Sequence, residues 1–480
     1  MTTNWKLLAP LSAALLLAAC APRQWLLPKL GIAVPAVNDL PADFEAPISN
    51  ETNQKMTGFG GGGGGVNRTP VIFVHGNTVS ASFWVPAREY FREQGYTGDE
   101  LWALSYGWNS VRYLDSNDLS VESLERIVNS VQNYLTRITG RQIHQVDLIG
   151  HSLGVTLTRQ WMKQTNSYHK VRSFIATAGA NNGVWTAWED SWAQQRPVSW
   201  ELFPDSPWQH QLNRGGQTPG ATHYMTLYDG SGWADVLFPP PNEDSGALEG
   251  AYNLPYNRVH GTHYDHLMIP RVPETMDAMI AWLSERGEPL PGAKPPSLIR
   301  EGDKVLADQD RAQVYCALDG RSPDRSLDPL KVWTLQPGRL TTCFAWNPDT
   351  LLPSVMARYK HVLHYQQAAE PLTVTASHES GAYEQVQQVR LTSNDPQAFI
   401  VYNTAGLTPE SGQPLYSEPV YIPAPVKLRA MAIAPDGRTS EVLELDLDIS
   451  MELVEARRSL QRQFDPGAPV LYEGRRKKGN

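Results

Sequence analysis

Hydrophobic residues between residues 67 and 290 fall into short continuous runs separated by segments of helical spacing. The continuous runs are typical of strands buried on both faces, and they predict strands at 71–76, 100–107, 146–150, 171–179 and 223–230. The helically spaced segments predict helices at 84–94, at 121–138, through Trp161 and at 276–287. Because strands that alternate with helices form a mostly parallel sheet covered on both faces, we predict one α/β domain over residues 67–290.

The pattern changes after a Pro- and Gly-rich linker at residues 287–296. Residues 297–367 show little periodicity, and the sequence assigns this small module no fold. From about residue 371 the pattern is all-β, since Lys427–Ile433 alternates between apolar and polar positions. We therefore predict an all-β module over residues 371–450 and a tail over residues 451–480.

The first 20 residues have the layout of an export signal, in which Lys6 precedes an apolar run too short to span a bilayer stably. The run ends in Leu-Ala-Ala-Cys, which resembles the lipobox of bacterial lipoproteins. This resemblance implies lipidation of Cys20 and, because Ala21 follows, an anchor in the outer membrane of the cell envelope. The alternative is an ordinary secretory signal that contains a cysteine. After the lipid anchor, residues 21–66 are expected to form a tether that contains a glycine-rich segment.

Composition and charge narrow the range of partners. The 480 residues are 41% hydrophobic and 19% charged, as in a globular protein. A formal net charge of -9 gives no general attraction to nucleic acid, so no nucleic-acid partner is expected. In an exported chain Cys316 and Cys343 can form a disulfide, which would stabilise the fold by about 3 kcal/mol.

The chemistry centres on a G-x-S-x-G motif at residues 150–154, which follows a predicted strand and precedes a predicted helix. In this context the motif is a nucleophile elbow, a sharp turn that projects Ser152 above the sheet. A serine nucleophile needs a base that is held by an acid. In folds that contain a nucleophile elbow, the order along the chain is serine, acid, histidine.

The acid and base are expected after residue 180. Asp235 fits the acid because it follows a strand in a G-x-x-D pattern with apolar residues and Pro after it, and Asp229 is the alternative. For the base, the Gly-x-His pattern before the last helix selects His263, with His266 as the alternative base or a partner of it. His260, His263, Asp265 and His266 also have a spacing that permits metal binding, but no further ligand cluster favours it, so neither a metal nor a cofactor is expected.

Two backbone N–H groups are expected to stabilise the oxyanion of an acyl-transfer intermediate. One belongs to Leu153, directly after the nucleophile, and the other to Asn77, in the loop after the first strand. The glycine run Gly60–Gly65 precedes that same strand rather than a helix, which argues against a phosphate loop. We expect a mobile loop near the rim of the active site, with a plain linker as the alternative.

Together the stretches PVIFVHGNTVSASFW, VDLIGHSLGV, YMTLYDGSGWAD and GTHYDHL resemble the α/β-hydrolase superfamily, and more narrowly the bacterial class 2 lipases and related extracellular polyhydroxyalkanoate depolymerases. The resemblance implies hydrolysis of carboxylic esters, with a lipid or a polyester as substrate, through an acyl-enzyme on a Ser152, His263 and Asp235 triad. A surface-anchored binding protein on a hydrolase scaffold is the alternative.

Two further segments depart from a compact hydrolase. Residues 183–220 contain five tryptophans and lie where these hydrolases insert caps, so they could line an acyl pocket or adsorb to a substrate surface; core packing is the alternative. Residues 371–450 resemble the Ig-like C-terminal domain of chitobiases, which implies a β-sandwich that serves as a spacer or as a module that binds a surface or a glycan.

Overall fold

The computed structural model describes residues 37–49, 53–106, 116–187, 197–231, 234–235, 237–238, 241–367 and 370–449. The predicted lipidation site Cys20, Trp188, Trp192 and the tail after residue 449 lie outside these ranges. None of the helices within them combines the length and apolar character needed to cross a bilayer.

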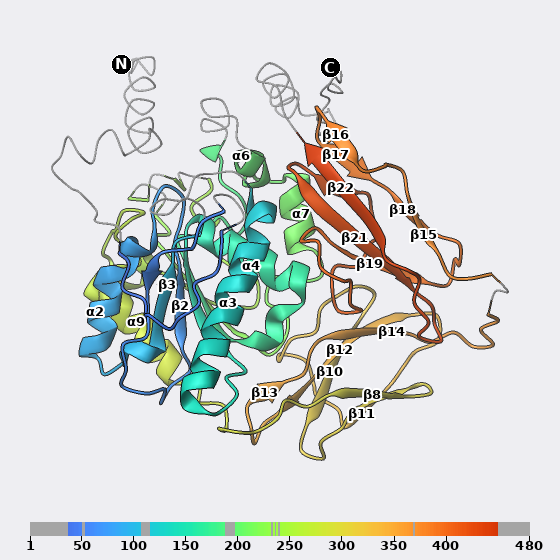
Figure 1. Cartoon of the computed structure of the whole chain (residues 1–480), viewed down its shortest axis with the longest axis horizontal. Helices are drawn as coiled ribbons and strands as arrows, with labels where there is room; N and C mark the ends of the chain where they lie inside the picture. Colours follow the sequence, from blue (N-terminus) through green and yellow to red (C-terminus); the bar gives the residue numbers. More distant parts are fainter. Residues whose placement is uncertain are drawn as a thin grey trace.

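The N-terminal half is built on one seven-stranded sheet with the order β1-β3-β2-β4-β5-β6-β7 (Figure 1). Strands β2 to β7 run parallel, and β1 pairs with β3 in the antiparallel direction. The strands span Gly58–Phe59 (β1), Val71–Val74 (β2), Leu101–Leu104 (β3), Val146–His151 (β4), Val171–Thr177 (β5), His223–Tyr228 (β6) and Tyr252–Pro255 (β7). Every residue of β2 to β5 is buried, which confirms the interpretation of the continuous apolar runs.

Helices cover both faces of this sheet. The long helices α3 (Asn117–Thr139) and α4 (Leu153–Thr165) pack against each other on one face, whereas α2 (Val85–Glu93) and α9 (Pro273–Ser284) pack together on the other. Shorter helices are α6 (Pro197–Glu201), α7 (Pro207–Asn213) and α8 (Tyr256–His260). The predicted α/β fold class is therefore confirmed.

The C-terminal half is all-β, which confirms the all-β pattern from about residue 371. Residues 297–367, which the sequence left without a fold, form two small sheets: β11 (Val332–Thr334), β9 (Lys304–Ala307) and β8 (Leu298–Glu301), and β10 (Gln313–Leu318), β12 (Leu340–Asn347), β13 (Leu352–Pro353) and β14 (Ala357–Lys360). Cys316 and Cys343 face each other in β10 and β12 and form the predicted disulfide.

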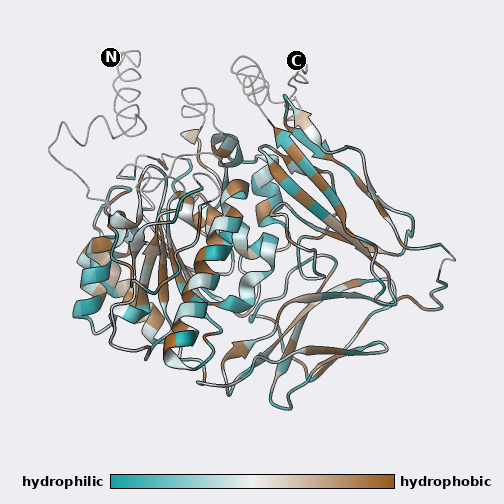
Figure 2. Ribbon diagram, in the orientation of Figure 1, coloured by the Kyte–Doolittle hydropathy of each residue, from teal (hydrophilic) through white to brown (hydrophobic). Residues whose placement is uncertain are grey.

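The last sheets carry the alternating pattern that the sequence predicted. They consist of β15 (Val374–Ala376) with β18 (Leu391–Ser393), of β16 (Gly381–Tyr383), β22 (Leu443–Ile449), β21 (Val426–Ile433) and β19 (Phe399–Asn403), and of β17 (Gln387–Val389) with β20 (Val420–Ile422). Figure 2 shows hydrophobic and hydrophilic residues alternating along β21 and β22. Their apolar faces enclose a core that is separate from the two cores of the parallel sheet.

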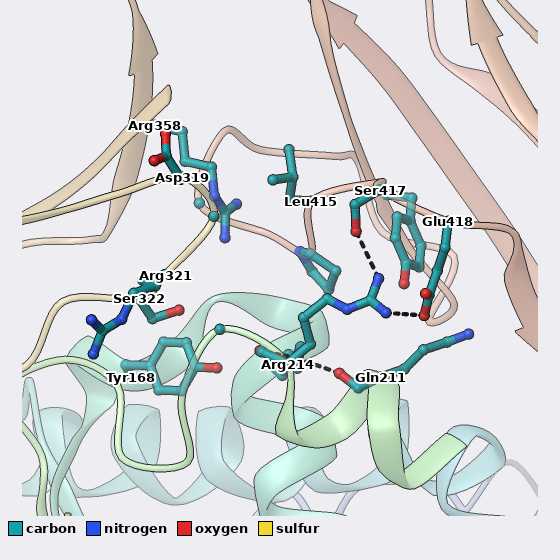
Figure 3. Close-up of a pocket in the computed structure, with 16 residues that line it drawn as sticks. Tyr168, Gln211, Arg214, Asp319, Arg321, Ser322, Arg358, Leu415, Ser417 and Glu418 are labelled. Carbon is teal, nitrogen blue, oxygen red and sulfur yellow. Dashed lines mark hydrogen bonds and ion pairs between the residues drawn. The ribbon is translucent and has the colours of Figure 1, made fainter. Parts of the chain in front are cut away.

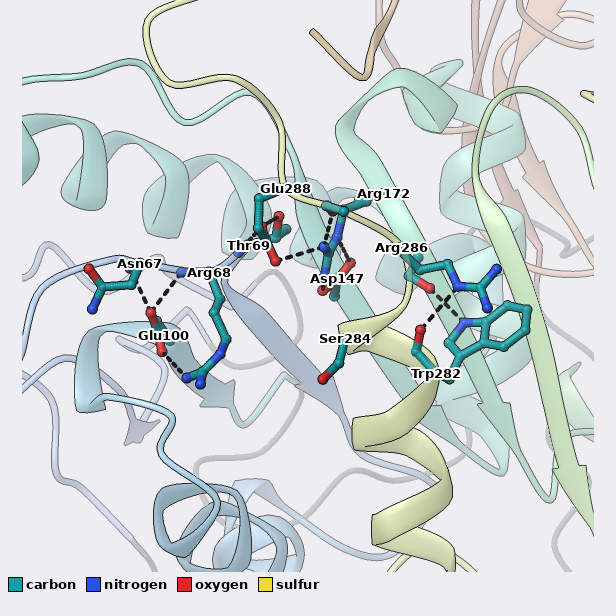
Figure 4. A network of polar contacts seen from close by, with 12 residues as sticks. Asn67, Arg68, Thr69, Glu100, Asp147, Arg172, Trp282, Ser284, Arg286 and Glu288 are labelled. Atoms are coloured by element: carbon teal, nitrogen blue, oxygen red, sulfur yellow. Dashed lines mark hydrogen bonds and ion pairs between the residues drawn. The ribbon is translucent and has the colours of Figure 1, made fainter. Parts of the chain in front are cut away.

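Ion pairs tie the linker to the edge of the sheet at which the parallel strands begin (Figure 4). Arg172 in β5 donates from Nε to Asp147 Oδ1 in β4 (3.0 Å) and from Nη1 to Glu288 Oε1 in the linker (2.8 Å). Glu288 in turn accepts from the backbone N–H of Thr69, just before β2 (2.7 Å). The linker is thus fastened at the edge opposite to the one at which the parallel strands end.

The glycine run lies at this same edge, so its expected place near the active-site rim is wrong. It precedes β2, and the residues it contacts precede β3, which runs parallel to β2. The N–H groups of Gly63 and Gly65 each donate to the buried carboxylate of Asp99 (3.0 Å and 3.0 Å). Both glycines have positive φ angles (91° and 76°), a conformation that other residues rarely adopt. The anion held by this loop is therefore a carboxylate of the chain itself.

Candidate active site

Ser152 lies in the turn between β4 and α4, as the motif predicted. Its backbone has φ 54° and ψ -123°, a conformation that is strained for a residue with a side chain. The Ser152 N–H donates to the carbonyl oxygen of Thr177 in β5 (3.0 Å), which holds the turn in place. Because Ser152 is the N-cap of α4, the positive end of the helix dipole lies beside it.

The loop after β2 approaches this turn closely. A Cβ atom on Gly76 would lie 2.9 Å from Ser152 Cβ and 3.0 Å from the carbonyl oxygen of His151, so only glycine fits here without a shift. The neighbouring His75 is fully buried, stacks on Tyr106 (ring centroids 4.2 Å apart) and has a pKa lowered to about 4 by burial. The residue before Asn77 thus lies against the elbow, and the N–H groups of Asn77 and Leu153 as oxyanion donors stay a prediction.

Two histidine–carboxylate pairs follow in the chain, and they differ in geometry. His266 Nδ1 lies 2.9 Å from Asp235 Oδ2, and only 13% of the His266 side chain is exposed. His263 Nδ1 lies 3.5 Å from Asp229 Oδ1, and 57% of the His263 side chain is exposed. The structure therefore joins the predicted acid, Asp235, to the alternative base, His266. The predicted base, His263, faces the alternative acid, Asp229.

In the Asp235–His266 pair, the hydrogen bonds are directed as a general base requires. Asp235 Oδ1 accepts from the backbone N–H of Leu237 (3.1 Å), which leaves Oδ2 to accept from Nδ1–H of His266. With its proton on Nδ1, His266 carries a lone pair on Nε2. This Nε2 atom is buried and has no hydrogen-bond partner among the described residues.

His151, the residue before the nucleophile, links the elbow to this pair. Its Nε2 lies 2.8 Å from the carbonyl oxygen of His266, and the two imidazole rings are 4.8 Å apart between centroids. Because a carbonyl only accepts, Nε2 of His151 carries the proton, and burial lowers the pKa of His151 well below its usual value, which keeps the ring neutral. No role was predicted for His151 from the sequence. The signal that could have suggested one is that a large polar residue stands inside the G-x-S-x-G motif.

The region around His260, His263, Asp265 and His266 does not assemble a metal site. Nowhere in the described ranges do three or more His, Cys, Asp or Glu side chains lie close enough to share a metal ion.

The described part of the tryptophan-rich insertion is mostly packed inside the protein. Trp200 and Trp208 are buried, whereas Trp185 is 40% exposed. Trp208 packs against Tyr421 of the C-terminal module, and Val198 in α6 packs on Leu153. For Trp200 and Trp208 core packing holds, and the insertion as a cap over the site stays a prediction.

Comparisons with known proteins bear on both halves of the chain. Residues 68–228 match the family model described as lipase (class 2), and residues 378–444 match that of the chitobiase/beta-hexosaminidase C-terminal domain. No curated protein sequence matches the chain.

Among solved structures, the Bacillus licheniformis lipase BlEst2 in its mature form is 17% identical, with 45% of this chain and 92% of that chain covered at a TM-score of 0.33. The Pyrococcus furiosus esterase is 16% identical, with 52% and 98% covered at a TM-score of 0.34. The two family models confirm the resemblance to the class 2 lipases of the α/β-hydrolase superfamily in the first half of the chain and to the chitobiase C-terminal domain in the second.

Proposed function

We propose that this chain is a serine ester hydrolase of the lipase or esterase class, with Ser152 as nucleophile, His266 as base and Asp235 as the acid that orients it. The observation that carries the proposal is the largely buried Asp235–His266 pair, which is tied through His151 to the strained turn that carries Ser152. The match of residues 68–228 to the class 2 lipase model supports the same chemistry.

The reaction follows from these positions. His266 Nε2 accepts the proton of the Ser152 hydroxyl as Oγ attacks the ester carbonyl, and Asp235 stabilises the imidazolium that forms. The N–H groups of Leu153 and Asn77 donate to the oxyanion of the tetrahedral intermediate. His266 then protonates the departing alcohol, and the acyl group remains on Ser152. Water, deprotonated by His266, attacks this acyl-enzyme, releases the carboxylic acid and restores the serine.

The assignment of His266 replaces the sequence-based preference for His263 on two grounds. The largely buried His266 keeps its hydrogen bond to the acid out of competition with water, whereas the more exposed His263 lies 3.5 Å from its carboxylate. His266 is also the histidine whose backbone is held by the residue next to the nucleophile.

The test is hydrolysis of p-nitrophenyl esters from acetate to palmitate by the purified protein and by Ser152→Ala. We expect wild-type turnover and a loss of at least about 1,000-fold in Ser152→Ala. Equal rates in the two proteins would overturn the proposal. The profile over chain length distinguishes a lipase from an esterase, and clearing of polyhydroxyalkanoate granules would identify the polyester-degrading alternative.

Export and lipid anchoring through Cys20 also stay predictions, since residues 1–36 lie outside the described ranges. Incorporation of a labelled fatty acid into the wild-type chain, and its loss in Cys20→Ser, would test the anchor.

A further inference from the structure

A cavity of about 190 Å³ lies where the hydrolase domain meets the C-terminal β-modules (Figure 3). Its walls come from α4, the segment after α7, the loop after β10, strand β14 and the loops on either side of residue 412. Lys163 near the C-terminal end of α4 lines it, whereas Ser152 precedes the first residue of that helix. Eleven residues at 1.5 Å each place the cavity about 16 Å along the helix from the nucleophile.

Positive charge predominates in the lining. The cationic side chains are Lys163, Arg214, Arg321 and Arg358, and the carboxylates are Asp319 and Glu418. Both carboxylates already have cationic partners, because Asp319 pairs with Arg339 outside the cavity and Glu418 pairs with Arg214. Within the described ranges, Lys163, Arg321 and Arg358 form no ion pair with any carboxylate. The cavity therefore holds a net positive charge that the protein itself does not neutralise.

Arg358 is the most informative of these groups. It is 7% exposed, and Figure 3 shows its guanidinium extending into the cavity from the wall opposite Tyr168. Its Nη1 donates to the carbonyl oxygen of Ser411 (2.9 Å) and to that of Gln413. Its Nε is buried and has no hydrogen-bond partner in the described part of the chain. A buried cationic N–H without an acceptor is costly, and a bound acceptor would remove that cost.

The titration of the buried cations agrees with a missing counter-charge. Burial lowers the pKa of Arg358 to about 10. Burial, together with the neighbouring Arg159, Arg358 and Arg214, lowers the pKa of Lys163 to about 7. Lys163 Nζ donates to backbone carbonyls at the end of α7, including those of Leu212 (3.1 Å) and Arg214 (2.7 Å), but these carry no full negative charge.

We propose that this cavity binds a small oxyanion, a phosphate or a short-chain carboxylate, that joins the hydrolase domain to the C-terminal modules. Guanidinium groups recognise both anions through paired N–H donors. The volume is below the roughly 300–1,000 Å³ of pockets for drug-sized molecules, so the ligand is small. The lining of the cavity comes from α4 on one side and from β14 and the loop at Leu415 on the other. A bound anion therefore stabilises the contact between the hydrolase domain and the C-terminal modules.

The test is isothermal titration of the purified protein with sodium phosphate and, separately, with sodium acetate at constant ionic strength. We expect saturable binding of at least one anion, weakened ten-fold or more in both Arg358→Gln and Arg214→Gln. Arg311→Gln is the matched control, because it removes the same charge from an exposed arginine that pairs with Asp349 and does not line the cavity.

The comparison of phosphate with acetate identifies which oxyanion the site prefers. Arg214 is partly exposed, so Arg214→Gln decides the question if Arg358→Gln does not fold. No saturable binding of either anion, or binding that is equal in all variants including Arg311→Gln, would overturn the proposal.

Discussion

Replacing His266 by alanine is expected to remove nearly all ester hydrolysis, whereas replacing His263 should change it little. His266 combines two contributions: proton transfer, typically about 100- to 10,000-fold, and the orientation supplied by Asp235 at 2.9 Å. Together they predict a loss of about 10,000-fold in kcat/KM, which corresponds to about 5.5 kcal/mol of transition-state stabilisation. For His263, 57% exposed and 3.5 Å from its carboxylate, we expect a change of about three-fold or less.

The assay is the initial rate of p-nitrophenyl butyrate hydrolysis, with circular dichroism and thermal unfolding to establish that both variants fold. The two positions make a matched pair, because they lie three residues apart in one loop and each faces an aspartate. Asp235→Asn and Asp229→Asn repeat the comparison on the acid side, with a large loss expected only for Asp235→Asn. A large loss in His263→Ala together with near-normal activity in His266→Ala would exclude His266 as the base and favour His263, the base predicted from the sequence.

Three further predictions concern stability, pH and close packing. Asp99→Ala removes the buried carboxylate that accepts from the N–H groups of Gly63 and Gly65, so chemical denaturation should show a loss of about 1–3 kcal/mol in unfolding free energy, and an unchanged midpoint would contradict that role. Burial, with the nearby Asp118, raises the pKa of the Glu201 carboxyl to about 8, so its contribution to stability is present below about pH 4.5 and is lost as pH rises through 8. Glu201→Gln should therefore flatten the decline in unfolding free energy measured between pH 5 and 9. An identical decline in both proteins would argue against this contribution. Gly76→Ala places a methyl group 2.9 Å from Ser152 Cβ and should lower kcat by ten-fold or more under conditions in which the variant is folded. An unchanged kcat would contradict this prediction.

The parallel sheet could be predicted because its strands carry their environment in their sequence. The strands β2 and β3 are apolar at every position, as burial on both faces requires, and the turn after β4 contains the G-x-S-x-G motif. The small sheets of residues 297–367 could not be predicted, because their strands are short and partly exposed and depend on pairing between distant segments.

The pairing of acids with bases could not be settled from sequence either. His263 and His266 lie in one loop, and the Gly-x-His pattern selects His263, but the choice depends on which side chain the loop directs inward. That direction is fixed by the hydrogen bond from His151 to the backbone of His266, a contact across 115 positions of the chain. Likewise, the glycine run and Asn77 are close in the sequence. Because β2 runs between them, they lie at opposite edges of the sheet.

Covalent labelling shows directly whether Ser152 is an activated nucleophile. The purified protein would be treated with a fluorophosphonate probe and the modified peptide identified by mass spectrometry, with Ser152→Ala and His266→Ala as comparisons. We expect labelling of Ser152 alone, none in Ser152→Ala and much slower labelling in His266→Ala. No labelling of the folded wild-type protein, or labelling at the same rate in His266→Ala, would contradict it.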